Sequence, residues 1–344
     1  MRAMVLRGTR LAIEEVERPR PGPMQVLARV RACGICGSDL HAARYAQDLV
    51  RAARAGDGPG WNEMDLDQGV VMGHEFVAEV VEPGPGAEGW APGTRVTGVP
   101  AVLDPASPGV MHPLGYSSRY PGAYGEYVVL SAPLLLRVPD HVPDRLAATT
   151  EPCAVALHAV REAKPAPEEH ALVLGAGPIG LLTLLWLKHQ GIRHVTVTEP
   201  AAPRRALAER LGADLVLDPA AGDVAARVAA AAGGPPPLVF ECVGVPGALQ
   251  QAMDLAAGRG RVMVVGACMT EDRITPMTGI RKHLTLRFLL GYSPEEVAEA
   301  LAAIAGGAID PAPLVTRTVG LDGLPEAFHA LGNPQDCKVV LELT

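Results

Sequence analysis

This sequence lacks basic clusters. Its 344 residues carry a formal net charge of −8, and no basic run exceeds short pairs such as Arg204-Arg205. Proteins that bind nucleic acids neutralise phosphates with clustered lysine and arginine, so an acidic chain without such clusters is not expected to bind them.

Long uninterrupted apolar runs are also absent. The segment 2–15 carries several charges and no apolar run, so we expect no signal peptide. The stretch 171–187 is apolar, but it is slightly short for a membrane span and contains the turn Gly-Ala-Gly-Pro-Ile-Gly. A buried strand, a turn and a buried helix explain it better, and we expect no membrane partner.

The cysteine spacings of a disulfide framework are missing as well. The six cysteines are scattered, which predicts a reducing compartment and a cytoplasmic protein. Cys33 and Cys36 form one Cys-x-x-Cys pair, which could be half of a zinc knuckle or a redox pair. No second pair follows, so a site with four cysteine ligands from paired knuckles is not expected. Cys242, Cys268 and Cys337 are expected to be small buried hydrophobes.

The length of the chain predicts two domains. Up to about residue 150 the chain is rich in glycine and proline, and its short apolar runs predict the strands of an irregular β-barrel. Beyond Glu151, predicted strands alternate with helices, which is typical of a parallel, doubly wound sheet. The barrel strands include 26–30, 76–81 and 127–130. The later strands are expected at 172–174, 195–198, 215–217, 238–240 and 262–265.

The remaining elements follow from shorter signals. Helices are expected to end near residue 190, to cover 204–211 and, on the surface, 220–234. The run 284–290 predicts a last strand of the sheet, a helix begins at Pro294, and the chain closes with strand 338–341. We see no internal repeat.

One run near the N-terminus gathers side chains that bind metals and carry protons: Gly34-Ile35-Cys36-Gly37-Ser38-Asp39-Leu40-His41. Cysteine, histidine and glutamate bind a borderline-soft divalent cation, and three protein ligands leave one tetrahedral position open for a substrate. We therefore predict one zinc ion held by Cys36, His74 and Glu151, with Cys153 as the rival third ligand. Asp39 is placed to orient His74, and Glu75 could enter as a transient fourth ligand.

A glycine pattern predicts a dinucleotide site. Gly175, Gly177 and Gly180 follow a predicted strand and open a helix, so that a pyrophosphate can approach the turn and the helix N-terminus. Glu199 ends the next strand, where a carboxylate binds ribose hydroxyls and repels a 2′-phosphate, so we predict NAD rather than NADP. Arg204 complicates this choice, because an arginine here could hold a 2′-phosphate. The predicted cofactor-binding residues are Gly175, Gly177, Pro178, Ile179, Gly180, Glu199, Arg204, Val243 and Val265.

Taken in order, these motifs resemble the zinc-dependent medium-chain dehydrogenase/reductase superfamily, most closely its sorbitol and threonine dehydrogenase branch. The resemblance covers nearly the whole chain and includes Phe240-Glu241-Cys242-Val243-Gly244. It implies an α/β protein with a GroES-like β-barrel catalytic domain, 1–152 and 293–344, interrupted by a Rossmann NAD-binding domain, 153–292. It also implies an active site between the domains, with catalytic zinc on Cys36, His74 and Glu151, and a proton relay through Ser38 and His41.

The chain departs from this family at two places. Many relatives carry a second, structural zinc on a lobe with four cysteines, but the matching stretch 83–124 contains no cysteine, so that zinc is expected to be absent. The connection from Cys36 to His74 is also longer than usual, with the extra residues in 45–68. This insertion, which includes Arg51, Arg54, Trp61 and Asn62, either shapes substrate access or is an inert surface excursion.

The combined pattern predicts an enzyme that transfers a hydride between a secondary alcohol or polyol, or the matching ketone or aldehyde, and NAD. One alternative is a zinc-silent reductase of activated C=C or C=N bonds on the same fold, and another is a non-catalytic nucleotide-binding protein. The substrate pocket is expected to include Trp61, Tyr116, Tyr120 and Leu290.

Assembly is predicted from the apolar run 284–290, because an exposed edge strand must be covered or paired. In the resembling family this strand pairs across a two-fold axis, which implies a homodimer or a homotetramer of such dimers. The alternative is a strand that the chain's own C-terminal helix covers.

Overall fold

The computed structural model describes residues 1–47, 50–51, 64–105, 107, 110–331, 333 and 335–343. The chain divides into two units. Unit 1 comprises Met1–Glu151, Val297–Ala305 and Val315–Thr344, and unit 2 comprises Pro152–Glu296 and Gly306–Leu314. The first division falls one residue before the predicted one. The second falls inside helix α10 (Pro294–Ala305) rather than before it.

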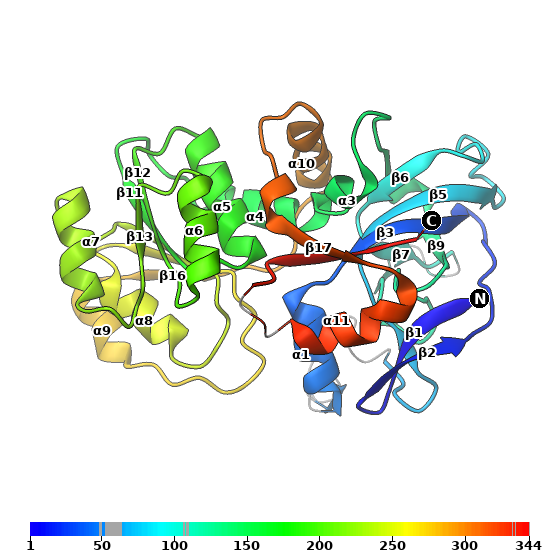
Figure 1. Ribbon diagram of the computed structural model, residues 1–344, viewed down its shortest axis with the longest axis horizontal. Helices are drawn as coiled ribbons and strands as arrows, with labels where there is room; N and C mark the ends of the chain where they lie inside the picture. Colours follow the sequence, from blue (N-terminus) through cyan, green and yellow to red (C-terminus); the bar gives the residue numbers. More distant parts are fainter. Residues whose placement is uncertain are drawn as a thin grey trace. The chain divides into compact units, whose positions relative to one another are not determined.

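Unit 1 is built around a long central strand, β3 (Gln25–Gly34). In the described part of the chain, β3 belongs to a seven-stranded sheet of order β10-β6-β5-β3-β18-β17, to which β9 adds by pairing with β3. Figure 1 shows the red C-terminal strands beside the blue β3, so the two ends of the chain meet in one barrel. The sheet strands are β5 (Glu75–Pro83), β6 (Arg95–Gly98), β9 (Tyr127–Ser131), β10 (Leu135–Arg137), β17 (Val315–Val319) and β18 (Lys338–Glu342).

Smaller elements close the barrel of unit 1. Its apolar core includes Met4, Phe76 and Tyr124, none of which is more than 1% exposed. The two smaller sheets contain β1 (Arg2–Arg7), β2 (Arg10–Glu15) and β4 (Val70–Val71), and β7 (Ala101–Leu103) with β8 (Met111–Pro113). The helices of unit 1 include α1 (Gly37–Arg44), α3 (Asp144–Ala147), the start of α4 (Thr150–Ala163), most of α10, and α11 (Leu324–Ala330).

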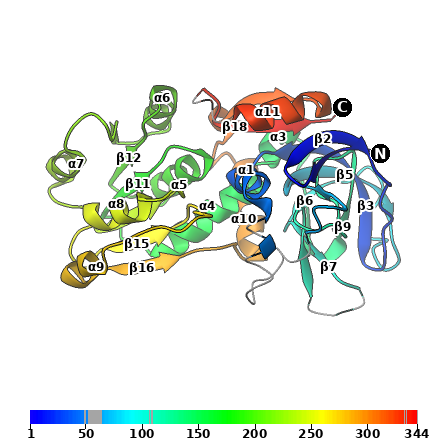
Figure 2. The ribbon, with the colours of Figure 1, turned by 90° about the horizontal axis from the view of Figure 1, so that it is seen from below.

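Unit 2 contains the predicted parallel sheet. Its described strands follow the order β13-β12-β11-β14-β15-β16, which is the Rossmann order with the first strand at the centre. Figure 2 shows β15 and β16 side by side at one edge. The strands are β11 (His170–Leu174), β12 (His194–Thr198), β13 (Leu215–Leu217), β14 (Leu238–Glu241), β15 (Arg261–Val264) and β16 (Thr285–Phe288).

The helices of unit 2 alternate with these strands, as predicted. They are α5 (Pro178–His189), α6 (Ala202–Arg210), α7 (Val224–Ala232), α8 (Ala248–Leu255) and α9 (Pro276–Lys282). The predicted architecture, a β-barrel unit and a unit with a Rossmann-type parallel sheet, is therefore observed. Among the described residues, every helix is too short or too polar to cross a membrane.

Candidate active site

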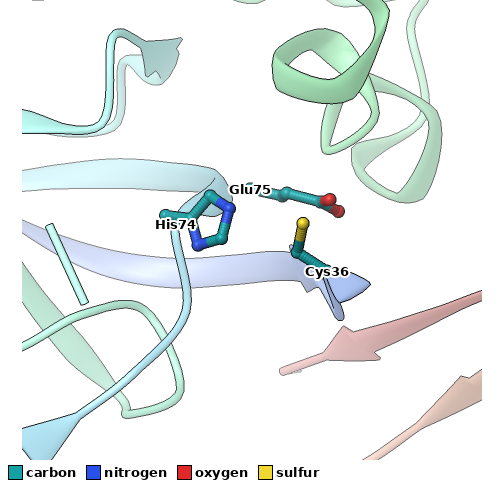
Figure 3. Close-up of side chains that lie close together, drawn as sticks. All are labelled: Cys36, His74 and Glu75. Atoms are coloured by element: carbon teal, nitrogen blue, oxygen red, sulfur yellow. The ribbon is translucent and has the colours of Figure 1, made fainter. Parts of the chain in front are cut away.

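Two neighbouring strands bring the predicted metal ligands to one point. Strand β3 ends at Gly34 and β5 begins at Glu75, and these two residues pair in the antiparallel register. Cys36, just after β3, and His74, just before β5, therefore lie at the same end of the strand pair. The ligand atoms of Cys36, His74 and Glu75 all lie within 4.8 Å of one another. Figure 3 shows the three side chains close together.

The chemistry of this cluster fits zinc. A cysteine sulfur, a histidine nitrogen and a carboxylate oxygen are all zinc ligands. His74 and Glu75 are buried and Cys36 is half-buried, so the cluster is shielded without being sealed. The described part of the chain holds no other group of three such residues.

Glycines make room for these side chains. A Cβ on Gly34 would lie 1.8 Å from Glu75 Oε2, so only glycine lets the carboxylate pack against the end of β3. Gly73, directly before His74, has φ +94°, and a Cβ there would lie 2.6 Å from the Tyr124 ring. The glycines of the two motifs therefore have steric reasons to be there.

Asp39 links helix α1 to His74. Its Oδ1 lies 3.2 Å from His74 Nδ1, and its two oxygens accept hydrogen bonds from the hydroxyls of Tyr116 (3.0 Å) and Tyr124 (2.6 Å). Complete burial alone would raise the pKa of Asp39, but His74 and these hydrogen bonds lower it below its ordinary value. Burial would likewise lower the pKa of His74, and Asp39 raises it. This geometry leaves His74 Nε2 for a metal, which is the orienting role predicted for Asp39.

The structure adds Lys338, which the sequence analysis did not assign to the site. Its Nζ lies 2.7 Å from both oxygens of Glu75 and donates to the Ile35 carbonyl oxygen at 3.0 Å. Lys338 is 2% exposed and Glu75 is 0% exposed. Burial would lower the pKa of Lys338, but Glu75 raises it. The only sequence signal was a single lysine directly before the apolar run Val339-Val340-Leu341 of the final strand.

The two candidate third ligands lie in different settings. Glu151 is half-buried in the first turn of α4, and its charge helps to raise the pKa of Lys338. Glu151 is not part of the 4.8 Å cluster. Cys153 is fully buried, which raises the pKa of its thiol to about 12, and its carbonyl oxygen accepts from the indole of Trp186.

The two predicted relay residues lie on helix α1. Ser38 Oγ lies 3.1 Å from Cys36 Sγ and 2.8 Å from the hydroxyl of Tyr116. His41 lies in the last turn of α1, and its buried Nδ1 has no hydrogen-bond partner among the described residues.

Of the residues predicted to line the substrate pocket, Tyr116 lies beside the metal cluster, with its ring 5.5 Å from that of His74. Tyr120 instead stacks near His112, and Leu290 is 93% exposed on unit 2. Trp61 lies outside the described residues, as do Arg54, Asn62 and most of the predicted insertion.

The glycine turn of unit 2 has the shape that a pyrophosphate needs. Gly175 has φ +92°, and a Cβ on Gly180 would lie 2.0 Å from the Gly175 carbonyl oxygen. Gly177 is the N-cap residue of α5, and no described side chain caps this helix. Pro178 carries no N–H, so the first N–H of the helix is that of Ile179, and no side-chain cap occupies it. A Cβ on Gly177 would meet nothing within 4 Å, which leaves space against the turn. These residues fit a dinucleotide.

Glu199 lies beneath this turn, at the tip of β12. Glu199 is 5% exposed, and its carboxylate accepts hydrogen bonds from the backbone N–H groups of Ala176 (2.9 Å) and Ala201 (3.0 Å). Arg205 donates to the Glu199 carbonyl oxygen at 2.8 Å and pairs with Asp218 at 3.2 Å. Arg204 is half-buried on α6.

Val243 and Val265, the two valines predicted to bind the cofactor, follow the carboxyl ends of β14 and β15. Val243 would be 3.0 Å from a Cβ on Gly175, and Val265 donates its N–H to the Glu241 carbonyl oxygen. Sequence reasoning missed the role of Glu241, whose buried Oε1 accepts from Val243 N (2.6 Å) and Gly244 N (2.9 Å) and fixes the loop beside the turn.

Comparison with known proteins identifies the two parts of this architecture. Residues 22–140 match the family model of the alcohol dehydrogenase GroES-like domain, and residues 178–306 match that of the zinc-binding dehydrogenases. (R,R)-butanediol dehydrogenase of Bacillus subtilis is 35% identical over 93% of each chain. L-threonine 3-dehydrogenase of Rhizobium rhizogenes is 29% identical over 96% of this chain and 95% of the relative.

Solved structures agree with this assignment. The crystal structure of 2R,3R-butanediol dehydrogenase from Bacillus subtilis superposes with a TM-score of 0.84 at 32% identity, covering 100% of this chain and 99% of the other. A protein assigned as a zinc-binding dehydrogenase from Sinorhizobium meliloti 1021, solved with NADP, has a TM-score of 0.84 at 28% identity, and 99% of each chain is covered.

The fold and the site thus define a dehydrogenase with a GroES-like barrel and a Rossmann sheet. The chain belongs to the zinc-type medium-chain dehydrogenase/reductase family, and it is an oxidoreductase of the alcohol dehydrogenase type that uses NAD(P). The predicted family and enzyme class are confirmed.

Proposed function

We propose that this enzyme oxidises a secondary alcohol or polyol with NAD, and reduces the matching ketone in the reverse direction. The observation that carries the proposal is the cluster of Cys36, His74 and Glu75 beside the Ser38 hydroxyl. The relatives named for 2,3-butanediol and L-threonine support the substrate class, since both compounds carry a secondary hydroxyl next to a second polar group.

We assign Cys36 and His74 as ligands of one catalytic zinc, with Glu151 as the third ligand. A carboxylate oxygen of Glu75 lies within 4.8 Å of the ligand atoms of both Cys36 and His74, which supports its role as the transient fourth ligand. When bound, zinc would act as a Lewis acid that lowers the pKa of the substrate hydroxyl. The absence of cysteine from 83–124 supports a single zinc, and in that stretch Asp104 instead pairs with His112 (3.4 Å) and Arg119 (3.2 Å).

The proton of the alcohol is proposed to leave through Ser38 and His41. Ser38 Oγ accepts the proton of the substrate hydroxyl and releases its own toward His41, from which it passes to solvent. The buried Nδ1 of His41, without a partner among the described residues, supports a relay that is completed by a bound molecule.

NAD is the proposed cofactor, held by the turn of Gly175, Gly177 and Gly180. The buried carboxylate of Glu199 disfavours a 2′-phosphate, and Arg205 is already engaged by Glu199 and Asp218. When bound, NAD would accept the hydride. We expect a higher kcat/KM with NAD than with NADP, and equal or better activity with NADP would refute this preference.

Assembly and location complete the proposal. Phe288 and Leu290, in and beside the edge strand β16, are 69% and 93% exposed, which supports a homodimer or a tetramer of dimers through this edge. The six cysteines are free, which supports a reducing cytoplasm.

The most direct experiment combines elemental analysis of the purified protein with a scan of alcohols in the presence of NAD. We expect about one zinc per chain and NADH formation from secondary alcohols and vicinal diols. Both should be lost in Cys36→Ala. Two zinc ions per chain would contradict the single site. Reduction of activated C=C bonds without any alcohol oxidation would favour the zinc-silent reductase instead.

A further inference from the structure

Glu75 belongs to two groups of side chains at once. Its carboxylate is part of the cluster with Cys36 and His74, and both of its oxygens also lie 2.7 Å from Lys338 Nζ. Because Glu75 and Lys338 are 0% and 2% exposed, solvent does not screen this pair. A metal ion at the cluster and the ammonium group would therefore compete for the same carboxylate.

Lys338 is fixed by contacts on more than one side. Its Nζ also donates to the carbonyl oxygen of Ile35, the residue directly before Cys36. Lys338 begins strand β18, which pairs with β3 through Val340 and Gly34. The ammonium group is thus built into the wall of the cluster rather than carried on a flexible side chain.

Glu75 is confined in the same way. A Cβ on Gly34 would lie 1.8 Å from Glu75 Oε2, so the carboxylate rests directly against the backbone of β3. In this position both oxygens contact Lys338, and the carboxylate also lies within 4.8 Å of the ligand atoms of Cys36 and His74.

We propose that Lys338 is a positioning residue that keeps Glu75 from becoming a permanent metal ligand and thereby keeps one coordination position open for the substrate. This inference rests on the proposed zinc site at Cys36 and His74. The proposal predicts a change in zinc affinity that is opposite to that of a substitution which only damages the site. Removal of the Lys338 charge should make zinc bind more tightly while activity falls, because Glu75 then fills the open position.

The test is a comparison of zinc dissociation constants for the apoprotein by competition with a chromophoric chelator. Lys338→Met, which removes the charge at similar volume, should bind zinc at least about tenfold more tightly, because the competing cation is gone. Its kcat/KM for alcohols should fall. Lys338→Arg keeps the charge and should stay near the wild-type affinity.

A second substitution identifies the carboxylate that is responsible. Glu75→Gln in the Lys338→Met background should abolish the gain in affinity, because the amide is a poor zinc ligand. Glu151→Gln in that background should leave the gain in place. If the Lys338→Met apoprotein does not stay folded, the rate of zinc release to the chelator from holoprotein is measured instead, in Lys338→Met and in the neutral donor variant Lys338→Gln. It should be slower than in wild type.

Weaker zinc binding or faster zinc release in the Lys338 variants would overturn the proposal, because that is the result of a purely structural lysine. A gain that survives Glu75→Gln would overturn it as well. Failure of the proposed function looks different: wild-type protein would bind zinc and oxidise no alcohol, while the order of zinc affinities could still be measured.

Discussion

Tyr116 shows how a single hydroxyl can set the direction of hydrogen bonds at the site. Burial raises the pKa of Tyr116 and Tyr124, so both keep their protons and donate them to the Asp39 carboxylate. The proton of Tyr116 is thereby used, and its oxygen must accept from Ser38 at 2.8 Å. With its proton held in this way, Ser38 presents lone pairs to a substrate hydroxyl.

This geometry predicts that Tyr116→Phe lowers kcat for alcohol oxidation by about three- to tenfold, the value of one hydrogen bond that orients a reacting group. Tyr124→Phe is the matched control, because it removes the other hydroxyl on Asp39 and leaves Ser38 untouched. Steady-state kinetics and the solvent deuterium isotope effect are compared for both variants. Equal losses in the two would show that Tyr116 acts through Asp39 rather than through Ser38.

The protonation of Glu241 makes the stability of the fold depend on pH. Burial raises the pKa of Glu241 above its ordinary value. The hydrogen bonds from the N–H groups of Gly244 and Val243 lower this pKa, but they do not cancel the effect of burial. The folded state therefore holds this proton to higher pH than the unfolded state does. By linkage, its contribution to stability is lost as pH rises from the ordinary value through the raised one.

Glu241→Gln keeps an acceptor for both N–H groups but does not titrate. Its free energy of unfolding relative to wild type should therefore rise across that pH interval, by about 1.4 kcal/mol for each unit by which the pKa is raised. Denaturant unfolding of the apoprotein at several pH values measures the difference. A difference that is constant with pH would contradict the role of Glu241 burial.

At the scale of elements, two glycines in the turn from β11 to α5 have different roles. Gly180 is needed for packing, and Gly177 leaves space for the cofactor. A Cβ on Gly180 would lie 2.0 Å from a backbone oxygen, so Gly180→Ala should destabilise unit 2 by about 1–3 kcal/mol. Gly177 has φ −72° and open space beside it, so Gly177→Ala should change stability by less than about 1 kcal/mol. It should still weaken NAD binding, because the methyl group occupies the space for the pyrophosphate.

Thermal unfolding and NAD titration of the two variants test this pair. Unchanged NAD affinity in a stable Gly177→Ala protein would mean that the cofactor does not approach the turn at this residue.

The strands of unit 2 could be predicted because their signals are local. The apolar runs at 172–174, 195–198 and 215–217 each lie within a strand, and the last of these matches β13 in full. The predicted strand 284–290 is shorter, Thr285–Phe288, since pairing with β15 ends at Phe288. Six helices of the described residues were not predicted: α1, α3, α4, α8, α9 and α11. All but α4 span eight residues or fewer, which is too short for a clear helical period in the sequence.

Some residues of the candidate site could likewise be predicted from local motifs, and others could not. Cys36, His74 and Glu75 lie in motifs that can be read over a few residues, and the structure brings them together. Lys338 reaches Glu75 only through the pairing of β18 with β3, and Tyr116 reaches Ser38 across 78 positions. Such partners depend on the folded barrel, and no local pattern could indicate them.

At the scale of the whole molecule, the free edge of the parallel sheet bears on assembly. Strand β16 pairs with β15 on one side, using N–H groups such as those of Thr285 and Leu289. Successive N–H groups of a strand point to opposite sides, so those of Leu286 and Phe288 face away from β15. Phe288 is 69% exposed, so no described part of the chain covers it. An apolar edge with outward N–H groups is suited to pairing with a second copy.

We therefore predict that the protein is at least a dimer at micromolar concentration and that Phe288→Lys, or Leu286→Pro, shifts it toward monomers. The N–H groups of both residues face away from β15, so the pairing of β16 with β15 should stay intact. The side chain of Leu286 packs against the core of unit 2, so Leu286→Pro should also lower stability. Met111→Lys is the control, because Met111 is 58% exposed and belongs to unit 1. Light scattering gives the mass of each protein, and circular dichroism checks that the fold is retained. A monomeric wild type would refute the assembly, and an oligomer that survives Leu286→Pro would place the interface elsewhere.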